Sequence, residues 1–161
     1  MSIVQVGHFT GKYALSKAFN DGQLRIVQII EANEFRYLNE LFGVELYEIF
    51  LDNYLDEDRF IKLMNPFSFE RHGKTFTCRG ITQMLLGFIY AHYRSEMQGV
   101  NTSVGQTVPN PEASELKNDL NVLSFWNESI RDFNLISYYM QKNKDVYPEF
   151  KGCYKLYNYH F

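Results

Sequence analysis

The chain has 161 residues, 45% hydrophobic and 22% charged, which suits one globular domain with a single core and argues against disorder throughout. The formal net charge is -3, and no basic tail or basic domain is present, which argues against tight DNA binding. The first residues lack the apolar run of a signal peptide and no segment is apolar enough for a membrane span. We therefore expect synthesis in a cytoplasm and no membrane partner.

Residues 1–20 are polar and interrupted by glycine, and we expect an N-terminal arm that becomes ordered on a partner surface. Residues 21–42 predict a helix, because Asn20 or Asp21 can cap it and apolar residues follow at helical spacing. Gly43 is well placed to end this helix in a left-handed conformation. The residues at helical spacing are Val27, Ile30, Glu34, Leu38 and Leu41, and only Glu34 is charged.

A second helix is predicted from about Val44 to Leu55, and the acidic run at residues 56–59 ends it. One side carries Tyr47, Phe50, Leu51 and Tyr54 at helical spacing, and of these we expect Tyr47 and Tyr54 in the core. The opposite side carries Glu45, Glu48, Asp52 and Asp56. These acids predict either a solvated face or a surface that repels DNA or meets basic residues of another subunit.

Residues 66–79 predict a β-hairpin that turns at His72-Gly73. With a two-residue turn, Phe69 faces Phe76, Phe67 faces Cys78, and Ser68 faces Thr77. One face of this ribbon is then apolar near its open end and the other is polar. Because an isolated hairpin is marginal in water, it must pack on the helices or on a neighbour.

A third helix is predicted over residues 80–97, with a buried stripe of Ile81, Met84, Leu85, Phe88 and Ile89. Gly87 within it indicates that another backbone passes close, since glycine weakens a helix. A fourth helix begins near Pro111 and runs for about 30 residues. Its predicted stripe is Leu116, Leu120, Leu123, Ile130, Phe133 and Met140.

Two segments have a composition typical of contact surfaces. The loop at residues 98–111 is long, polar and almost uncharged, and long loops in compact domains are usually functional or disordered. The segment at residues 149–161 is rich in aromatic residues at alternate positions, which suits addition as a strand to another chain's sheet. The alternative is that this segment folds back onto the chain's own hairpin.

No catalytic or metal-binding motif is present. The histidines His8, His72, His92 and His160 are scattered, and no phosphate-binding loop or nucleophile elbow occurs. His92 and Glu96 lie one helical turn apart, and we expect a half-buried, hydrogen-bonded histidine rather than a ligand or base. Cys78 and Cys153 predict two free thiols. We therefore expect no enzyme activity, cofactor or metal.

Residues 16–51 resemble the opening of the head–tail connector (adaptor, or head-completion) proteins of tailed bacteriophages. In that family a capped helix carries an aromatic-rich segment into a Leu-Gly-x-x-Leu-Tyr step, which spans residues 41–47 here with Phe42 inserted before the glycine. Residues 80–115 resemble the hairpin–helix–loop passage of the same family, with Leu-Leu-Gly-Phe where alanine is more usual. Within the family, the chain resembles the ring proteins of crAss-like phages.

The resemblance implies a mainly α fold, like a four-helix bundle, with a β-hairpin between helices 2 and 3 and extended N- and C-terminal arms. Residues 21–148 would be the connector domain. The protein would form a ring, a dodecamer, in the virion neck between the portal and the tail. Its partners would be further copies of itself, the portal protein and the next neck or tail protein, and genome DNA would pass through without specific binding.

The resemblance also assigns roles to three groups of residues. Candidates for contact between subunits are Val100, Asn101, Thr102, Val104, Gln106, Thr107 and Val108. Candidates for portal docking are Tyr154, Leu156, Tyr157, Tyr159 and Phe161. Possible channel-facing acids are Glu45, Glu48, Asp52 and Asp56.

Three other functions remain open from the sequence. One is another phage protein for tail completion or assembly, with a different partner. A second is a small cytoplasmic module whose aromatic residues line a ligand pocket. A third is a small enzyme that uses His92 and Glu96.

Overall fold

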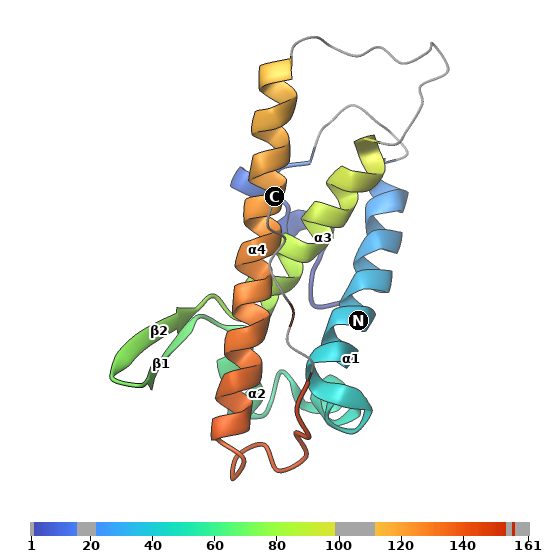
Figure 1. Ribbon diagram of the computed structural model, residues 1–161. Helices are drawn as coiled ribbons and strands as arrows, with labels where there is room; N and C mark the ends of the chain where they lie inside the picture. Colours follow the sequence, from blue (N-terminus) through green and yellow to red (C-terminus); the bar gives the residue numbers. More distant parts are fainter. Residues whose placement is uncertain (1, 16–21, 99–111, 154–155, 157–161) are drawn as a thin grey trace.

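The computed structural model describes residues 2–15, 22–98, 112–153 and 156, without the side chains of residues 22–24, 97–98 and 112–120. This part is mainly helical, with a two-stranded antiparallel hairpin between the second and third helices, as predicted (Figure 1). The elements are α1 (Gly22–Asn53), α2 (Asp58–Met64), β1 (Phe67–Arg71), β2 (Lys74–Cys78), α3 (Ile81–Gln98) and α4 (Glu112–Lys142).

Helix α3 is the centre of the molecule and packs against both α1 and α4 (Figure 1). Its predicted stripe is confirmed, since all five stripe residues have no exposed surface. Gly87 lies where α4 passes: a Cβ added there would be 2.1 Å from the Ser129 hydroxyl oxygen and 3.1 Å from the Phe125 carbonyl oxygen. The predicted close approach of a second backbone is therefore confirmed, and the approaching backbone is that of α4.

Helix α1 changes direction at Gly43, which has φ 72° and ψ 166°. The positive φ was expected, but the residue is extended in ψ rather than left-handed helical, so the helix resumes after a kink. Only glycine adopts this combination without strain. The sequence analysis missed α2: Phe60 and Leu63 are buried and anchor this short helix directly after the acidic run.

The N-terminal arm differs from the expectation that it needs another chain. Two short 3-10 turns, at Val6–His8 and Gly11–Tyr13, place it against the helices, where Ile3, Val4, Phe9 and Tyr13 are buried. Glu34, the one charged residue among the helically spaced residues predicted in the first helix, explains why the arm is held there. Glu34 is buried and accepts backbone N–H bonds from Ile3 at 2.8 Å and Val4 at 3.0 Å. The same chain thus supplies the partner surface.

The hairpin has the predicted register, including the pairs Phe67 with Cys78, Ser68 with Thr77 and Phe69 with Phe76. His72 and Gly73 both have positive φ, 51° and 71°, as a two-residue primed turn requires. The Ser68 and Thr77 hydroxyls bond across the exposed face at 3.0 Å. The opposite face packs on α4, where the Phe67 ring centre lies 4.9 Å from that of Tyr139.

Candidate interaction surfaces

The predicted acidic residues Glu45, Glu48, Asp52 and Asp56 are all exposed along and just beyond the second half of α1. No Lys or Arg occurs between Val44 and Asp58, so this surface has no cations of its own. Glu45 pairs with Lys151 from the chain's C-terminal segment, but both side chains are exposed and such pairs contribute little. The exposure of the four acids agrees with both a solvated face and a contact surface, and a position facing a DNA channel stays a prediction.

An exposed apolar stripe runs beside these acids. Val44, Leu51 and Leu55 are 66%, 42% and 65% exposed. Val44 and Leu51 are seven residues apart and share one side of α1, and Leu55 follows in the turn after the helix ends. Phe35, 57% exposed, extends the stripe through an edge-to-face contact with Tyr47, with ring centres 5.8 Å apart. We call Phe35, Val44, Tyr47, Leu51 and Leu55 the α1 apolar stripe.

Leu51 shares the predicted apolar side of this helix but lies outside the core. Leu46 and Phe50 have no exposed surface and supply the buried side of this half of α1, whereas Tyr47 and Tyr54 are only partly buried. The kink at Gly43 sets which side of the second half meets the core. The sequence did contain a signal for the exposed stripe, because Val44, Leu51 and Leu55 recur at helical spacing on a side that Phe50 does not share.

A second surface combines cations with aromatic rings beside the hairpin. The Arg71 guanidinium lies 4.2 Å from the ring centre of Tyr138, and the Lys142 ammonium 5.9 Å from the same ring. The Lys62 ammonium is 4.9 Å from the ring centre of Tyr139. We call Lys62, Arg71, Lys74, Tyr138 and Lys142 the hairpin basic face. Sequence reasoning missed this face, because its residues come from α2, the hairpin and α4.

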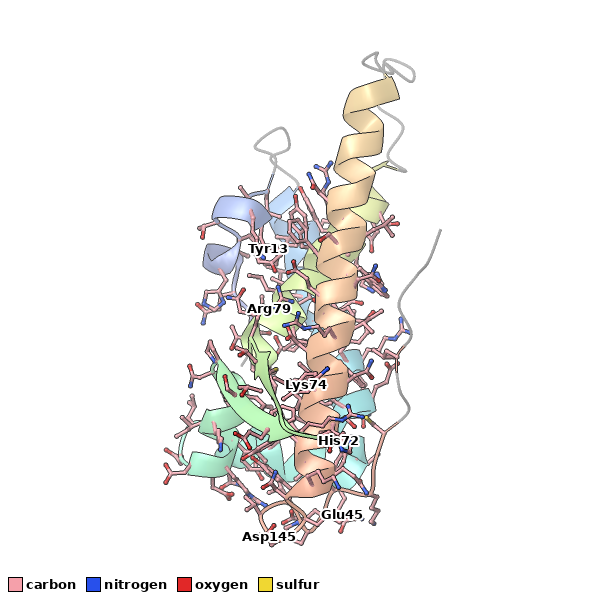
Figure 2. The ribbon with its side chains drawn as sticks, turned by 60° about the vertical axis from the view of Figure 1, so that its left-hand side comes forward. Tyr13, Glu45, His72, Lys74, Arg79 and Asp145 are labelled. Atoms are coloured by element: carbon pink, nitrogen blue, oxygen red, sulfur yellow. The ribbon has the colours of Figure 1, made fainter. Side chains whose placement is uncertain are left out.

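The two surfaces lie on different sides of the molecule. In Figure 1 the hairpin projects at the left edge beyond α4, whereas α1 forms the right edge. Figure 2 brings the hairpin forward, with His72 and Lys74 in front of α4. A single copy therefore presents an acidic, apolar surface and a basic, aromatic one in different directions.

The C-terminal segment lies along α4 as far as it is described. The Asn134 amide pairs with both backbone groups of Leu156: it donates to the carbonyl oxygen at 2.8 Å and accepts from the N–H at 3.2 Å. The Cys153 thiol donates to the Ser137 hydroxyl at 2.9 Å. At Cys153 and Leu156 the segment therefore contacts α4, and neither residue bonds to the hairpin. The other docking candidates, Tyr154, Tyr157, Tyr159 and Phe161, lie outside the described residues.

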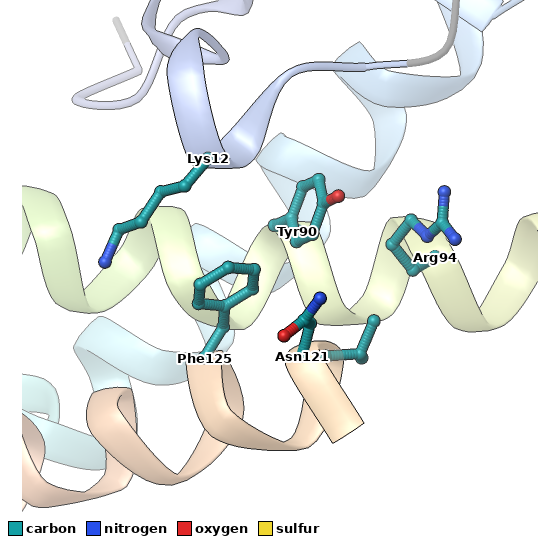
Figure 3. A pocket seen from close by; sticks show the side chains of 6 residues that line it. Lys12, Tyr90, Arg94, Asn121 and Phe125 are labelled. Carbon is teal, nitrogen blue, oxygen red and sulfur yellow. The ribbon is translucent and has the colours of Figure 1, made fainter. Parts of the chain in front are cut away.

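The subunit-contact candidates Val100, Asn101, Thr102, Val104, Gln106, Thr107 and Val108 also lie outside the described residues. A cavity of about 340 Å³ is present between the N-terminal arm, α3 and α4. Lys12 and Arg94 lie at its two ends, with Tyr90 and Phe125 between them (Figure 3). The Lys12 ammonium pairs with Glu128 at 3.4 Å, so Arg94 is the lining cation that an anionic ligand would meet.

His92 is half-buried, as predicted, and its Nε2 lies 2.9 Å from the Tyr37 hydroxyl. Burial lowers the pKa of His92 below its ordinary 6.5; the Arg36 charge lowers it further and Glu96 opposes this. Its ring centre is 5.4 Å from that of Trp126. Glu96 forms an ion pair with Arg25 at 3.2 Å. The geometry thus gives His92 a packing role and does not pair it with Glu96 as an acid–base couple.

A buried ion pair joins the end of the hairpin to α4. The Arg79 Nε donates to the Asp132 carboxylate at 2.5 Å, and Asp132 is fully buried. Arg79 also reaches Glu128 and, at 3.4 Å, the Tyr13 hydroxyl of the N-terminal arm. These contacts tie three parts of the chain together, and removing one partner of a buried pair is strongly destabilising. This cluster has a structural role.

The described helices include none that is long and apolar enough to cross a membrane. Within the same described residues, His, Cys, Asp and Glu side chains form no group of three or more that could hold a metal ion. Comparisons of the chain with protein-family models, with curated proteins and with solved structures found no match.

Proposed function

We propose that this protein is a structural component of a tailed-phage virion, where copies of it form a ring in the neck that joins the portal to the tail. The resemblance of residues 16–51 and 80–115 to head–tail connector proteins supports this proposal. The architecture agrees with it, since the resemblance implies a mainly helical fold with a hairpin between the second and third helices, and the chain has that fold.

The α1 apolar stripe is the structural observation that most favours an assembly role. Contiguous apolar groups are rarely left exposed on a monomer without a function, and they usually mark contact with another molecule. Here Val44 and Leu55 are more exposed than buried. Because the stripe borders four exposed acids, it has the form of a protein-contact surface with a polar rim.

The acids next to the stripe are compatible with the passage of DNA. A protein that holds DNA uses Lys and Arg against its phosphates, and the stretch from Val44 to Asp58 contains neither. Acids lining a lumen would repel the phosphates and let the duplex slide. We therefore propose that Glu45, Glu48, Asp52 and Asp56 face either the lumen or a neighbouring subunit.

The test is light scattering and negative-stain imaging of the purified chain over a wide range of concentrations, followed by a pull-down with portal protein. We expect ring particles with a central hole, or a chain that binds portal protein and forms rings on it. A chain that remains monomeric and does not bind portal protein would refute the proposal. Binding to a tail protein alone would favour the tail-completion alternative.

The cavity beside Tyr90 favours one second candidate, the small-ligand module. Arg94 in its lining predicts an anionic ligand. Thermal-shift screening with small carboxylates and phosphates tests this function, with Arg94→Gln as the binding-deficient control. A saturable rise in melting temperature that Arg94→Gln abolishes would support it, and no shift with any such ligand would exclude it.

A further inference from the structure

We propose that copies of this protein associate head to tail, the hairpin basic face of one copy docking on the α1 apolar stripe and adjacent acids of the next. The second copy as partner rests on the proposed ring-forming function. The choice of these two faces rests on their charge, their exposed groups and their positions in the fold.

Charge complementarity is the first argument. The acidic side carries Glu45, Glu48, Asp52 and Asp56 with no Lys or Arg between Val44 and Asp58. On the hairpin side Lys62, Arg71 and Lys142 lie over two tyrosines, and Lys74 lies opposite Arg71 in the hairpin. Opposite potentials on facing surfaces steer association and set its register. Like-charged surfaces would repel, so neither face is suited to pair with a copy of itself.

The uncharged parts of the two faces also match. The α1 apolar stripe offers aliphatic side chains that are 42% to 66% exposed. The hairpin basic face offers rings, since Phe69 stacks on Tyr138 with centres 5.9 Å apart and both side chains remain partly exposed. Tyrosine and arginine are enriched in interfaces, because they bury a large surface and keep a polar end. An aromatic, cationic face against an aliphatic, acidic one therefore both pairs opposite charges and buries apolar surface on each side.

The positions of the faces determine what such a contact builds. The hairpin and α1 form opposite edges of the molecule in Figure 1. When two copies meet through unlike faces, one copy keeps a free basic face and the other keeps a free acidic face. Further copies can then add, and the chain of copies closes into a ring when the rotation between successive copies permits. A contact between identical faces would stop at a dimer.

The experiment uses two charge-reversed variants of the full chain. Glu48→Lys with Asp52→Lys reverses the acidic side, and Lys74→Glu with Lys142→Glu reverses the basic side; all four side chains are exposed. Glu40→Lys with Glu96→Lys is the control matched to the first variant, because it changes the net charge by the same four units. Both acids are exposed and form only exposed ion pairs, Glu40 lies on another side of α1 than Phe35, and Glu96 lies near the end of α3. Far-UV circular dichroism checks that every variant is folded.

Sedimentation velocity then measures assembly of each variant and of their mixture. Each reversed variant should assemble at least tenfold more weakly than the wild type or the control, since like charges then face each other. An equimolar mixture of the two should recover assembly, because reversed faces complement reversed faces. Raising the salt to about 1 M should weaken wild-type assembly, since screening then acts within about 3 Å.

The outcomes separate this contact from the proposed function. Rings that form equally well in both reversed variants overturn the contact and leave the ring function standing. A wild-type chain that binds portal protein but never contacts a second copy overturns the contact as well. Open filaments or short oligomers that weaken in each reversed variant and recover in the mixture confirm the contact. Such assemblies count against a closed ring in the neck.

Discussion

At the scale of single residues, two glycines with positive φ differ in the space around them. Gly73, at the hairpin turn, has φ 71° and open space where a Cβ would lie. Gly80, before α3, has φ 85°, and a Cβ there would be 2.6 Å from the carbonyl oxygens of both Met64 and Asn65. The second glycine therefore allows the end of α2 to approach the start of α3.

Replacing each glycine by alanine separates backbone strain from steric overlap. Gly73→Ala should cost about 1–2 kcal/mol of unfolding free energy, from the left-handed conformation alone. Gly80→Ala should cost roughly 3–5 kcal/mol, because backbone atoms must also move apart. Urea unfolding followed by circular dichroism measures both. Equal costs for the two variants would contradict the close approach.

His92 makes the stability of the fold depend on pH. The pKa of His92 in the folded chain is lowered by burial, so between that pKa and 6.5 the unfolded chain binds more protons and stability rises with pH. As the pH falls from about 7.5 to about 5, the unfolding free energy of the wild type should decrease. The decrease is at most about 1.4 kcal/mol per pH unit, between 6.5 and the pKa of His92 in the folded chain. His92→Gln should lack that component. Urea unfolding at each pH measures the free energy of unfolding of both chains. An equal loss of this free energy in the wild type and in His92→Gln would exclude the assignment to His92.

At the scale of elements, sequence reasoning succeeded where local chemistry decides. Alternating residues and the His72-Gly73 turn determine the hairpin register, and Gly43 marks the break in α1. Prediction from the sequence failed where contacts between distant residues determine the structure. Glu34 can be buried because N–H bonds from residues 31 and 30 positions away offset part of its loss of hydration, and no periodicity reveals these bonds. The seven residues of α2 were too few for a helical pattern.

The C-terminal segment provides an element-scale prediction. Asn134→Ala removes both hydrogen bonds to Leu156, so the segment should detach from α4 more often. The two bonds together contribute about 1.4 kcal/mol, so Cys153 should react with a maleimide roughly tenfold faster. Cys78 is an internal control, since it is fully buried and burial raises its pKa to about 12. Asn143→Ala, which removes a bond to the Tyr139 carbonyl, is the matched variant. Unchanged labelling of Cys153 would show that Asn134 does not hold the segment.

At the scale of the whole molecule, the candidate surfaces were only partly predictable. The four acids on α1 were identified correctly as exposed, because opposite polarity on two helix sides is a local pattern. The α1 apolar stripe depends on the direction taken after Gly43, and the hairpin basic face depends on the packing of α2, the hairpin and α4. These require the tertiary fold.

Deleting residues 154–161 tests the docking role of the C-terminal segment. The helices should retain their far-UV signal, because the described contacts of the deleted residues are confined to Leu156 on α4. Portal binding in a pull-down should be lost. The Asn134→Ala chain, with the segment detached but present, should still bind. Portal binding by the truncated chain would assign docking to another part of the protein.

The packing around Trp126 gives the protein a built-in optical reporter. It is the chain's single tryptophan, and its ring centre lies 5.1 Å from Phe88 of α3, 5.4 Å from His92 and 6.3 Å from Tyr37 of α1. A protonated imidazole quenches indole emission at such range. The fluorescence of unlabelled protein should therefore dim as His92 gains its proton, and it should report any loosening between α1, α3 and α4 when copies assemble.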